Sequence, residues 1–183
     1  MKEIKIAMFR NDLENIPTYS LPKDFKFRLF KEGDQSKWAQ IETAVGEFDN
    51  ENEALERFEE EFAPHLDEFK ERCLFIENKE GKKIGTTTAW YGKLTEDDEI
   101  MGRIHWVSIL PEYQGMKLAK PLLSKAMHLL AKYHSKAYLT SQTTSYKAVN
   151  MYLAYGFKPV VTDKKDREAW TLLEEVLDKK IQI

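Results

Sequence analysis

The segment from Ile104 to Leu123, IHWVSILPEYQGMKLAKPLL, constrains the fold of this chain more than any other stretch. Its first part alternates as a β-strand does, so its side chains fall on two faces: Ile104, Trp106 and Ser108 on one, His105, Val107 and Ile109 on the other. Pro111 ends the strand, because proline has no N–H to donate to a neighbouring strand. Leucines and alanines at helical spacing follow the polar turn, so the segment predicts a strand, a turn and a helix in succession.

The turn between this strand and this helix is polar and contains Gly115. The first N–H groups of a helix have no partner within the helix, and they lie at the positive end of the helix dipole. Such a turn suits an anion, most naturally a phosphate. An ordinary strand-turn-helix junction is the alternative, because one glycine is a weak signal.

The turn resembles the coenzyme A pyrophosphate loop of the GNAT superfamily of N-acetyltransferases. That loop reads Gln/Arg-x-x-Gly-x-Gly/Ala, usually after Val-x-Pro-x-Tyr. The matching residues are Ile109, Pro111, Tyr113, Gln114 and Ala119. The chain departs from the pattern at Lys117, which stands where the family has its middle glycine.

A second segment, SYKAVNMYLAYGF from Ser145 to Phe157, resembles the other half of the family pattern, Asn-x-x-Ala-x-x-Leu-Tyr-x-x-x-Gly-Phe. The matching residues are Ala148, Tyr152, Gly156 and Phe157, whereas Ser145 replaces the usual Asn and Met151 the usual Leu. The two motifs occur in the family's order. The resemblance covers residues 73–161 well and the first seventy residues poorly.

The resemblance implies an acetyl-CoA-dependent N-acetyltransferase with an α+β (mixed α/β) fold. Its central, twisted, mostly antiparallel sheet would contain one β-α-β crossover and be flanked by helices. Acetyl-CoA would be a co-substrate, and no metal is expected because no Cys/His cluster has zinc-ligand spacing. The implied coenzyme contacts are Ile109, Leu110, Pro111, Gln114, Gly115, Met116, Lys117, Leu118, Ala119, Ser145 and Tyr152.

Sequence patterns along the chain agree with this order of elements. Predicted strands are Ile4–Phe9 (at an edge of the sheet), Phe25–Phe30, Cys73–Glu77, Lys83–Tyr91, Glu99–Leu110, Ala137–Ser141, Phe157–Val161 and Ala169–Leu173. Predicted helices begin after caps at Asp34, Asn52 and Ser145, and a further helix follows the phosphate turn and ends near His134. We expect one domain of 183 residues. Within it, residues 1–72 would form N-terminal strands and acceptor-side helices, 73–161 the coenzyme-binding core, and 162–183 a C-terminal strand and tail.

Acetyl transfer to an amine needs a proton donor for the departing thiolate, and the resemblance assigns this role to Tyr152. A phenol is protonated at neutral pH and can act as a general acid. The alternative is that Tyr152 is a core aromatic residue on an amphipathic helix.

A base is useful because an alkylammonium is roughly three pH units from neutral at pH 7. His105 is the best candidate, since histidine titrates where a base must work and the alternation places it on the same strand face as Ile109. The alternative is that His105 only packs within the protein and has no catalytic role. Glu99, the C-terminal carboxylate or water are other proton acceptors.

A run of acidic residues precedes the coenzyme-binding core. It comprises Glu47, Asp49, Glu51, Glu53, Glu56, Glu59, Glu60 and Glu61. One interpretation is a solvated helix surface. The other is attraction for a cationic acceptor such as a polyamine, an aminoglycoside or a peptide amine.

Composition narrows the class of protein. The net charge of −3 and the pI near 5.9 argue against nonspecific nucleic-acid binding. We expect a cytoplasmic monomer or homodimer, because no apolar run suits a membrane span, no signal-peptide pattern is present, and the single Cys73 cannot form an internal disulfide. The predicted reaction is direct attack of a primary amine, with a small molecule favoured, on acetyl-CoA in a ternary complex. The alternatives are a protein N-terminal or lysine acetyltransferase and a noncatalytic acyl-CoA-binding module.

Overall fold

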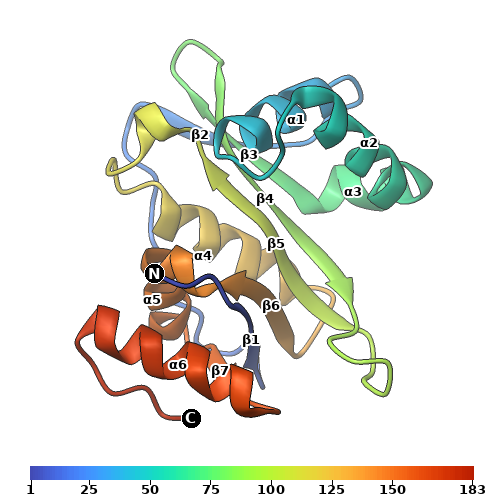
Figure 1. Cartoon of the computed structure of the whole chain (residues 1–183). Coiled ribbons are helices and arrows are strands. Elements are labelled where there is room, and N and C mark those ends of the chain that lie inside the picture. The colour runs from blue at the N-terminus through green and yellow to red at the C-terminus, as the bar shows by residue number, and fades with distance from the viewer.

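The computed structural model describes residues 1–183 as seven strands and six α-helices with three short 3-10 turns (Figure 1). The strands are β1 Lys5–Arg10, β2 Phe25–Leu29, β3 Cys73–Asn78, β4 Lys83–Gly92, β5 Met101–Ile109, β6 Ala137–Gln142 and β7 Lys158–Val160. The helices are α1 Gln35–Ala44, α2 Glu51–Glu61, α3 Leu66–Arg72, α4 Ala119–Leu130, α5 Tyr146–Ala154 and α6 Lys164–Leu177. The 3-10 turns are η1 Ala63–His65, η2 Pro111–Tyr113 and η3 Thr143–Ser145.

All seven strands form one sheet in the order β2-β3-β4-β5-β6-β1-β7. Every neighbouring pair is antiparallel except β5 and β6, which α4 connects as a parallel β-α-β crossover. The predicted β3–β4 hairpin is present, with Cys73 opposite Thr88. The predicted fold class, a mixed α+β domain with a mostly antiparallel sheet and one crossover, is confirmed.

The N-terminal strand does not lie at the edge of the sheet, as its weak alternation suggested. Strand β1 lies between β6 and β7, with Ala7 opposite both Thr140 and Val160. Its Ile6 and Met8 are buried while Lys5 is exposed, so one face of the strand is apolar. The alternation reported this face correctly but carried no information about the neighbours of the strand.

The C-terminal strand predicted at Ala169–Leu173 is wrong, because these residues lie within helix α6. The apolar run is short enough to suit either structure. The buried residues Ala169, Trp170 and Leu173 have helical spacing. Asp163 also caps the helix, its carboxylate accepting a hydrogen bond of 2.8 Å from the Asp166 N–H.

The predicted helix caps are also corrected at several positions. Asn50 rather than Asn52 caps α2, accepting a hydrogen bond of 3.1 Å from the Glu53 N–H. Asp34 precedes α1, but its carboxylate pairs with Arg28 and Lys83 instead of capping the helix. Ser145 makes no capping hydrogen bond to α5, and α4 ends at Leu130 rather than near His134.

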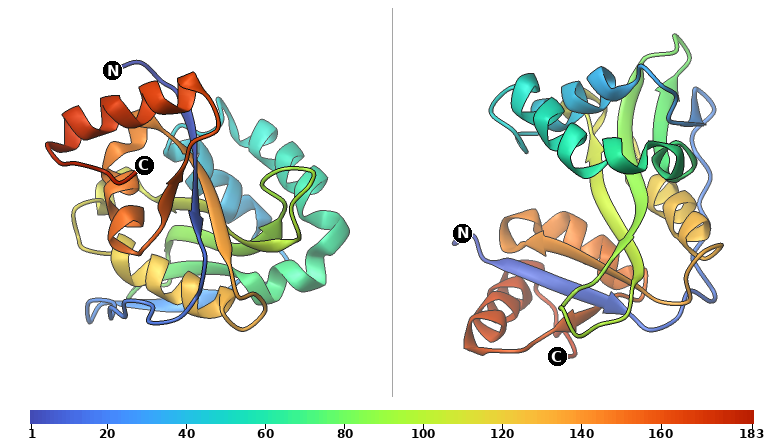
Figure 2. Two further views of the ribbon diagram at one scale, coloured as in Figure 1. Left: turned by 90° about the horizontal axis from the view of Figure 1, so that it is seen from below. Right: turned by 90° about the vertical axis from the view of Figure 1, so that its right-hand side faces the viewer.

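Two apolar layers enclose the part of the sheet that carries β3, β4 and β5. Helices α1 and α2 cover one face and α4 covers the other (Figure 2). The first layer is aromatic and contains Phe30, Trp38, Phe58, Phe62, Phe69, Phe75 and Trp90. On the opposite face, α4 buries Leu122, Leu123, Ala126, Met127 and Leu130. Strand β5 therefore lies between two layers of helices.

Candidate functional site

The turn between β5 and α4 is open to solvent where the phosphate loop is predicted. Gln114, Gly115, Met116 and Lys117 are all exposed. Both Gly115 (φ +80°) and Lys117 (φ +61°) adopt the left-handed backbone conformation that favours glycine. Lys117 therefore adopts, as a lysine, a conformation that a glycine would adopt at little cost.

A run of backbone N–H groups in this loop has no acceptor in the protein. The N–H groups from Gly115 to Lys120 donate to neither backbone nor side chain. Leu118 provides no side-chain cap, and the first turn of α4 contains no acidic residue. Free N–H groups beside the positive end of a helix form a site for an anion. The predicted loop residues from Gln114 to Ala119 thus lie together in one turn, in which the N–H groups from Gly115 onwards have no acceptor.

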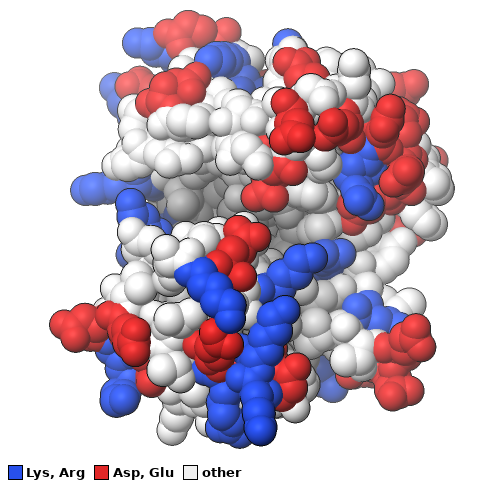
Figure 3. Space-filling view, viewed as in Figure 1, with Lys and Arg blue, Asp and Glu red and all other residues white.

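Strands β5 and β6 separate immediately after they pair. Only Gly102 with Ala137 and Arg103 with Tyr138 are partners across this parallel pair. Beyond them, β5 continues beside β4 and β6 continues beside β1, so the two halves of the sheet diverge (Figures 1 and 2). The surface is hollowed between these halves (Figure 3). The edge of β5 from Ile104 to Ile109 therefore faces the gap without a partner strand.

A β-bulge in β5 changes which side chains face α1 and α2. The register with β4 shifts between Thr86 and Thr88, and Trp106 has a φ of +52°. His105 is opposite Thr88 and Ser108 is opposite Thr86, so both lie on one face although they are three residues apart. The predicted alternation fails beyond the bulge, and the prediction that His105 shares a face with Ile109 is wrong.

Tyr152 lies on α5 with 7% of its surface exposed. Burial raises the pKa of its phenol, and the Glu47 carboxylate raises it further. The phenol is therefore protonated at neutral pH, as a proton donor must be. No hydrogen bond from another protein group stabilises the phenolate, so the Tyr152 hydroxyl is free to meet a bound molecule.

His105 is held by a carboxylate from α2. Its Nε2 lies 2.6 Å from Oε1 of Glu61, and the other oxygen of Glu61 accepts a hydrogen bond of 3.3 Å from the Trp106 indole. Burial lowers the pKa of His105, although Glu61 opposes this effect. Burial also opposes ionisation of Glu61, but His105, Trp106 and Arg103 together hold its pKa below the ordinary value. Only Nδ1 of His105 remains to accept a proton from a substrate.

Glu42 of α1 is fully buried against the same strand. The Ser108 hydroxyl donates a hydrogen bond of 2.7 Å to Oε2 of Glu42, whereas Oε1 has no partner. Burial raises the pKa of this carboxyl to about 8, against the effect of Ser108. Glu42 is not among the site residues predicted from the sequence. A signal was present, because Glu42 is one helical turn after the buried Trp38.

Glu47 lies in the loop between α1 and α2 and was predicted only as part of an acidic run. Its side chain reaches solvent, but the protein packed around its carboxyl and the charge of Glu3 raise its pKa. Glu3 itself is bonded to Thr144, which follows β6. The charge of Glu47 also acts on Tyr152 and Glu42. The Glu47 carboxylate itself forms no ion pair and accepts no hydrogen bond in the protein.

Other features carry no assigned chemistry. Cys73 is buried, and burial raises the pKa of its thiol to about 12, which makes it a core residue. No three His, Cys, Asp or Glu side chains gather in a metal-binding arrangement. No helix has the length and apolar character required to cross a bilayer.

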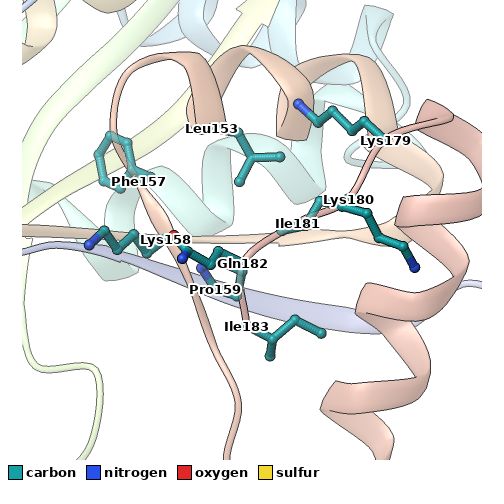
Figure 4. Close-up of a pocket in the computed structure, with 9 residues that line it drawn as sticks. All are labelled: Leu153, Phe157, Lys158, Pro159, Lys179, Lys180, Ile181, Gln182 and Ile183. Atoms are coloured by element: carbon teal, nitrogen blue, oxygen red, sulfur yellow. The ribbon is translucent and has the colours of Figure 1, made fainter.

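A separate hollow lies beside the C-terminal tail (Figure 4). Leu153, Pro159 and Ile181 line it, and Ile181 is fixed by its N–H, which donates a hydrogen bond of 2.7 Å to Glu174. The lysines around it, Lys158, Lys179 and Lys180, extend in different directions (Figure 4). They do not converge on one point, so we assign no ligand to this hollow.

The free N–H groups at the start of α4 agree with the pyrophosphate loop that the first motif resembles. Residues 37–157 match the model of the acetyltransferase (GNAT) family. The chain belongs to this family. The GNAT match includes both halves of the predicted motif, from the loop at Gln114 to Phe157.

Solved structures support the GNAT fold. A GCN5-related N-acetyltransferase from Sphaerobacter thermophilus superposes with a TM-score of 0.66 at 18% identity, over 86% of this chain and 48% of that one. A GNAT-family acetyltransferase from Colwellia psychrerythraea gives 0.64 at 10% identity, over 87% and 55% of the two chains. A GNAT-family protein from Novosphingobium aromaticivorans, described as a putative acetyltransferase, gives 0.56 at 16% identity, over 87% and 61%. At these identities the likeness shows the fold alone.

This GNAT chain spans about half the length of the Sphaerobacter and Colwellia proteins. No curated protein matches its sequence. The family and the fold are therefore shown, and the acceptor must be argued from the residues of the site.

Proposed function

We propose that this chain transfers an acetyl group from acetyl-CoA to a primary amine of a small molecule, by direct attack in a ternary complex. One observation carries the proposal: six consecutive backbone N–H groups, from Gly115 to Lys120, have no acceptor and lie beside the gap between β5 and β6. In a GNAT protein, these groups fit the pyrophosphate of coenzyme A. Lys117 is exposed in the same loop and can add a positive charge.

The open edge of β5 fits the rest of the coenzyme. Between Ile104 and Ile109 this edge has no partner strand, so its backbone groups are available to carbonyl groups of the coenzyme arm. Leu110 and Pro111 then lead into the phosphate loop, and Ser145 lies at the start of α5. Tyr152 follows on α5, where it donates its proton to the departing thiolate.

The chemical class of the amine acceptor is proposed from the carboxyl groups near the site. Glu47 raises the pKa of Glu42, Glu3 raises the pKa of Glu47, and neither the Glu42 nor the Glu47 carboxyl has a basic partner in the protein. An ammonium group would supply the missing positive charge, so we propose a cationic amine rather than a neutral or acidic acceptor.

The proposal is tested by mixing the protein with acetyl-CoA and a panel of primary amines: butylamine, 1,4-diaminobutane, spermidine, tyramine and glucosamine. Release of free thiol and mass spectrometry of the acetylated amine are measured together. We expect amine-dependent release and a product heavier by one acetyl group. Tight acetyl-CoA binding without acetylation of any amine would indicate the noncatalytic binding module. Acetylation of peptide amines alone would indicate a protein acetyltransferase.

A further inference from the structure

Helix α5, which carries Tyr152, is tied to the start of α4 through the side chain of Tyr155 (Figure 1). Tyr155 directly follows the last residue of α5, and only 1% of its surface is exposed. Its hydroxyl donates a hydrogen bond of 2.7 Å to the Lys120 carbonyl in the first turn of α4. The same hydroxyl lies 2.9 Å from Oγ of Ser124, one helical turn later. A buried hydroxyl with two partners at these distances fixes the two helices relative to each other at this contact.

Lys120 takes part both in this contact and in the proposed phosphate site. Its N–H is the last of the free N–H groups that begin at Gly115, whereas its carbonyl accepts the hydrogen bond from Tyr155. Helix α4 is itself anchored, because Leu122 and Leu123 are fully buried. The Tyr155 hydroxyl therefore ties α5 to a well-anchored part of the proposed coenzyme site.

The backbone around Tyr155 leads directly to Tyr152. The Tyr152 carbonyl accepts hydrogen bonds of 3.0 Å from the Tyr155 N–H and 3.1 Å from the Phe157 N–H. Gly156 allows the chain to reverse here, since its φ of +80° is a conformation that favours glycine. The Tyr155 carbonyl in turn accepts a hydrogen bond from the Arg10 guanidinium on β1. The position of Tyr152 is therefore coupled to that of Tyr155.

We propose that Tyr155 is a positioning residue, which sets the distance between the Tyr152 phenol and the phosphate-binding turn before α4. This inference rests on the proposed acetyltransferase function and adds the residue that holds its proton donor in place. The sulfur of coenzyme A is joined covalently to the pyrophosphate, so its reach from α4 is limited once the phosphates are bound. A proton donor on α5 serves that sulfur only if α5 is held relative to α4. A misplacement of about 1 Å can lower a rate ~10²-fold.

A purely structural role for Tyr155 makes a different prediction. A residue that only stabilises the fold lowers the rate by reducing the amount of folded protein, whether or not residue 152 carries a hydroxyl. A positioning residue acts through the Tyr152 phenol, so its effect disappears when that phenol is removed. A double-mutant cycle separates the two roles, because effects that act through one group are not additive.

The test measures single-turnover acetylation of the best acceptor from the amine panel by wild type, Tyr155→Phe, Tyr152→Phe and the double variant. Tyr155→Phe keeps the ring and loses both contacts of the hydroxyl. We expect its rate to fall about tenfold, with acetyl-CoA affinity within about twofold of wild type. In the Tyr152→Phe background, the same substitution should change the rate by less than about twofold.

Tyr133→Phe is the matched control. It removes a tyrosine hydroxyl that is bonded to Glu71, beyond the far end of α4, and should react at the wild-type rate. If Tyr155→Phe does not fold, Ser124→Ala takes its place, because it removes one of the two contacts of the Tyr155 hydroxyl. Its rate should fall by about threefold, and this loss should also disappear in the Tyr152→Phe background.

Two results would overturn the positioning role while leaving the proposed function intact. One is a wild-type rate in Tyr155→Phe, or in Ser124→Ala where it is the variant used. The other is a loss of equal size with and without the Tyr152 hydroxyl, which is the result expected of a structural role. Failure of the wild type to acetylate any amine would instead overturn the proposed function, and the inference with it.

Discussion

Ser108 on β5 donates a hydrogen bond of 2.7 Å to the buried carboxyl of Glu42 on α1, and this bond ties the helix to the bulged strand. Burial raises the Glu42 pKa to about 8 from an ordinary 4.5. The folded protein therefore keeps a proton that the unfolded chain loses above pH 4.5. The contribution of Glu42 to stability is fully present below pH 4.5 and is lost as the pH rises to about 8.

Glu42→Gln should remove this pH dependence, because an amide of the same shape carries no proton to lose. We expect the variant to be more stable than wild type at about pH 8, on the order of 2 kcal/mol, and similar to it near pH 5. Urea unfolding at both pH values measures the difference. Parallel curves for the two proteins from pH 5 to 8 would show that Glu42 does not titrate in this range.

Gly115→Glu should abolish stabilisation by acetyl-CoA, because it places a carboxylate among the N–H groups that face the pyrophosphate. Acetyl-CoA at 100 times its dissociation constant should raise the melting temperature of wild type by about 5–10 °C. Gly81→Glu is the matched control, since Gly81 lies in an exposed hairpin turn with a φ of +79° against +80° for Gly115. A full shift in Gly115→Glu would refute the loop assignment.

Lys117→Gly should relieve backbone strain and remove a positive charge together. A glycine adopts a φ of +61° freely, so the free protein should gain about 1 kcal/mol of stability. Its acetyl-CoA affinity should match wild type at low salt but depend less on ionic strength, and Lys117→Glu should bind much more weakly. Affinity at two salt concentrations measures both effects. Tight binding by Lys117→Glu at low salt would show that the ammonium lies away from the phosphates.

His105→Ala tests the base that was predicted from the sequence. Because Nε2 of His105 is bonded to Glu61 at 2.6 Å, we expect His105 not to be the base, and the acidic limb of the rate profile should persist in this variant. The main effect should be on stability, lower by about 1–3 kcal/mol, because Glu61 loses a partner at 2.6 Å. If the acidic limb disappears while the protein stays folded, His105 is the base and the sequence prediction holds.

Residues 73–161 were predictable because two motifs and clear periodicity coincide there. The β3–β4 hairpin, the crossover through α4 and the left-handed Gly156 after α5 all follow from local patterns. The position of β1 was not predictable, because alternation reports a buried face but not the strands beside it. The residues of α6 were misassigned, since a five-residue apolar run suits both a strand and a helix.

The phosphate loop and Tyr152 could be predicted as site residues from the sequence, whereas the buried carboxyl of Glu42 was not predicted. The bulge at Trp106 depends on a register shift against β4, which no pattern within β5 reveals. It places Ser108 over Glu42 and turns His105 towards Glu61. These contacts join segments more than forty residues apart, and the sequence of either segment alone does not contain them.

The acetyl transfer itself is tested most directly by single-turnover acetylation with Tyr152→Phe. The ring keeps its packing, but no proton is available for the thiolate. We expect the rate of acetylated-amine formation to fall ~10²–10⁴-fold with acetyl-CoA affinity little changed. Tyr146→Phe, on the same helix and with only a half-buried side chain, should react as wild type does. A Tyr152→Phe variant that acetylates the amine at the wild-type rate would contradict the account.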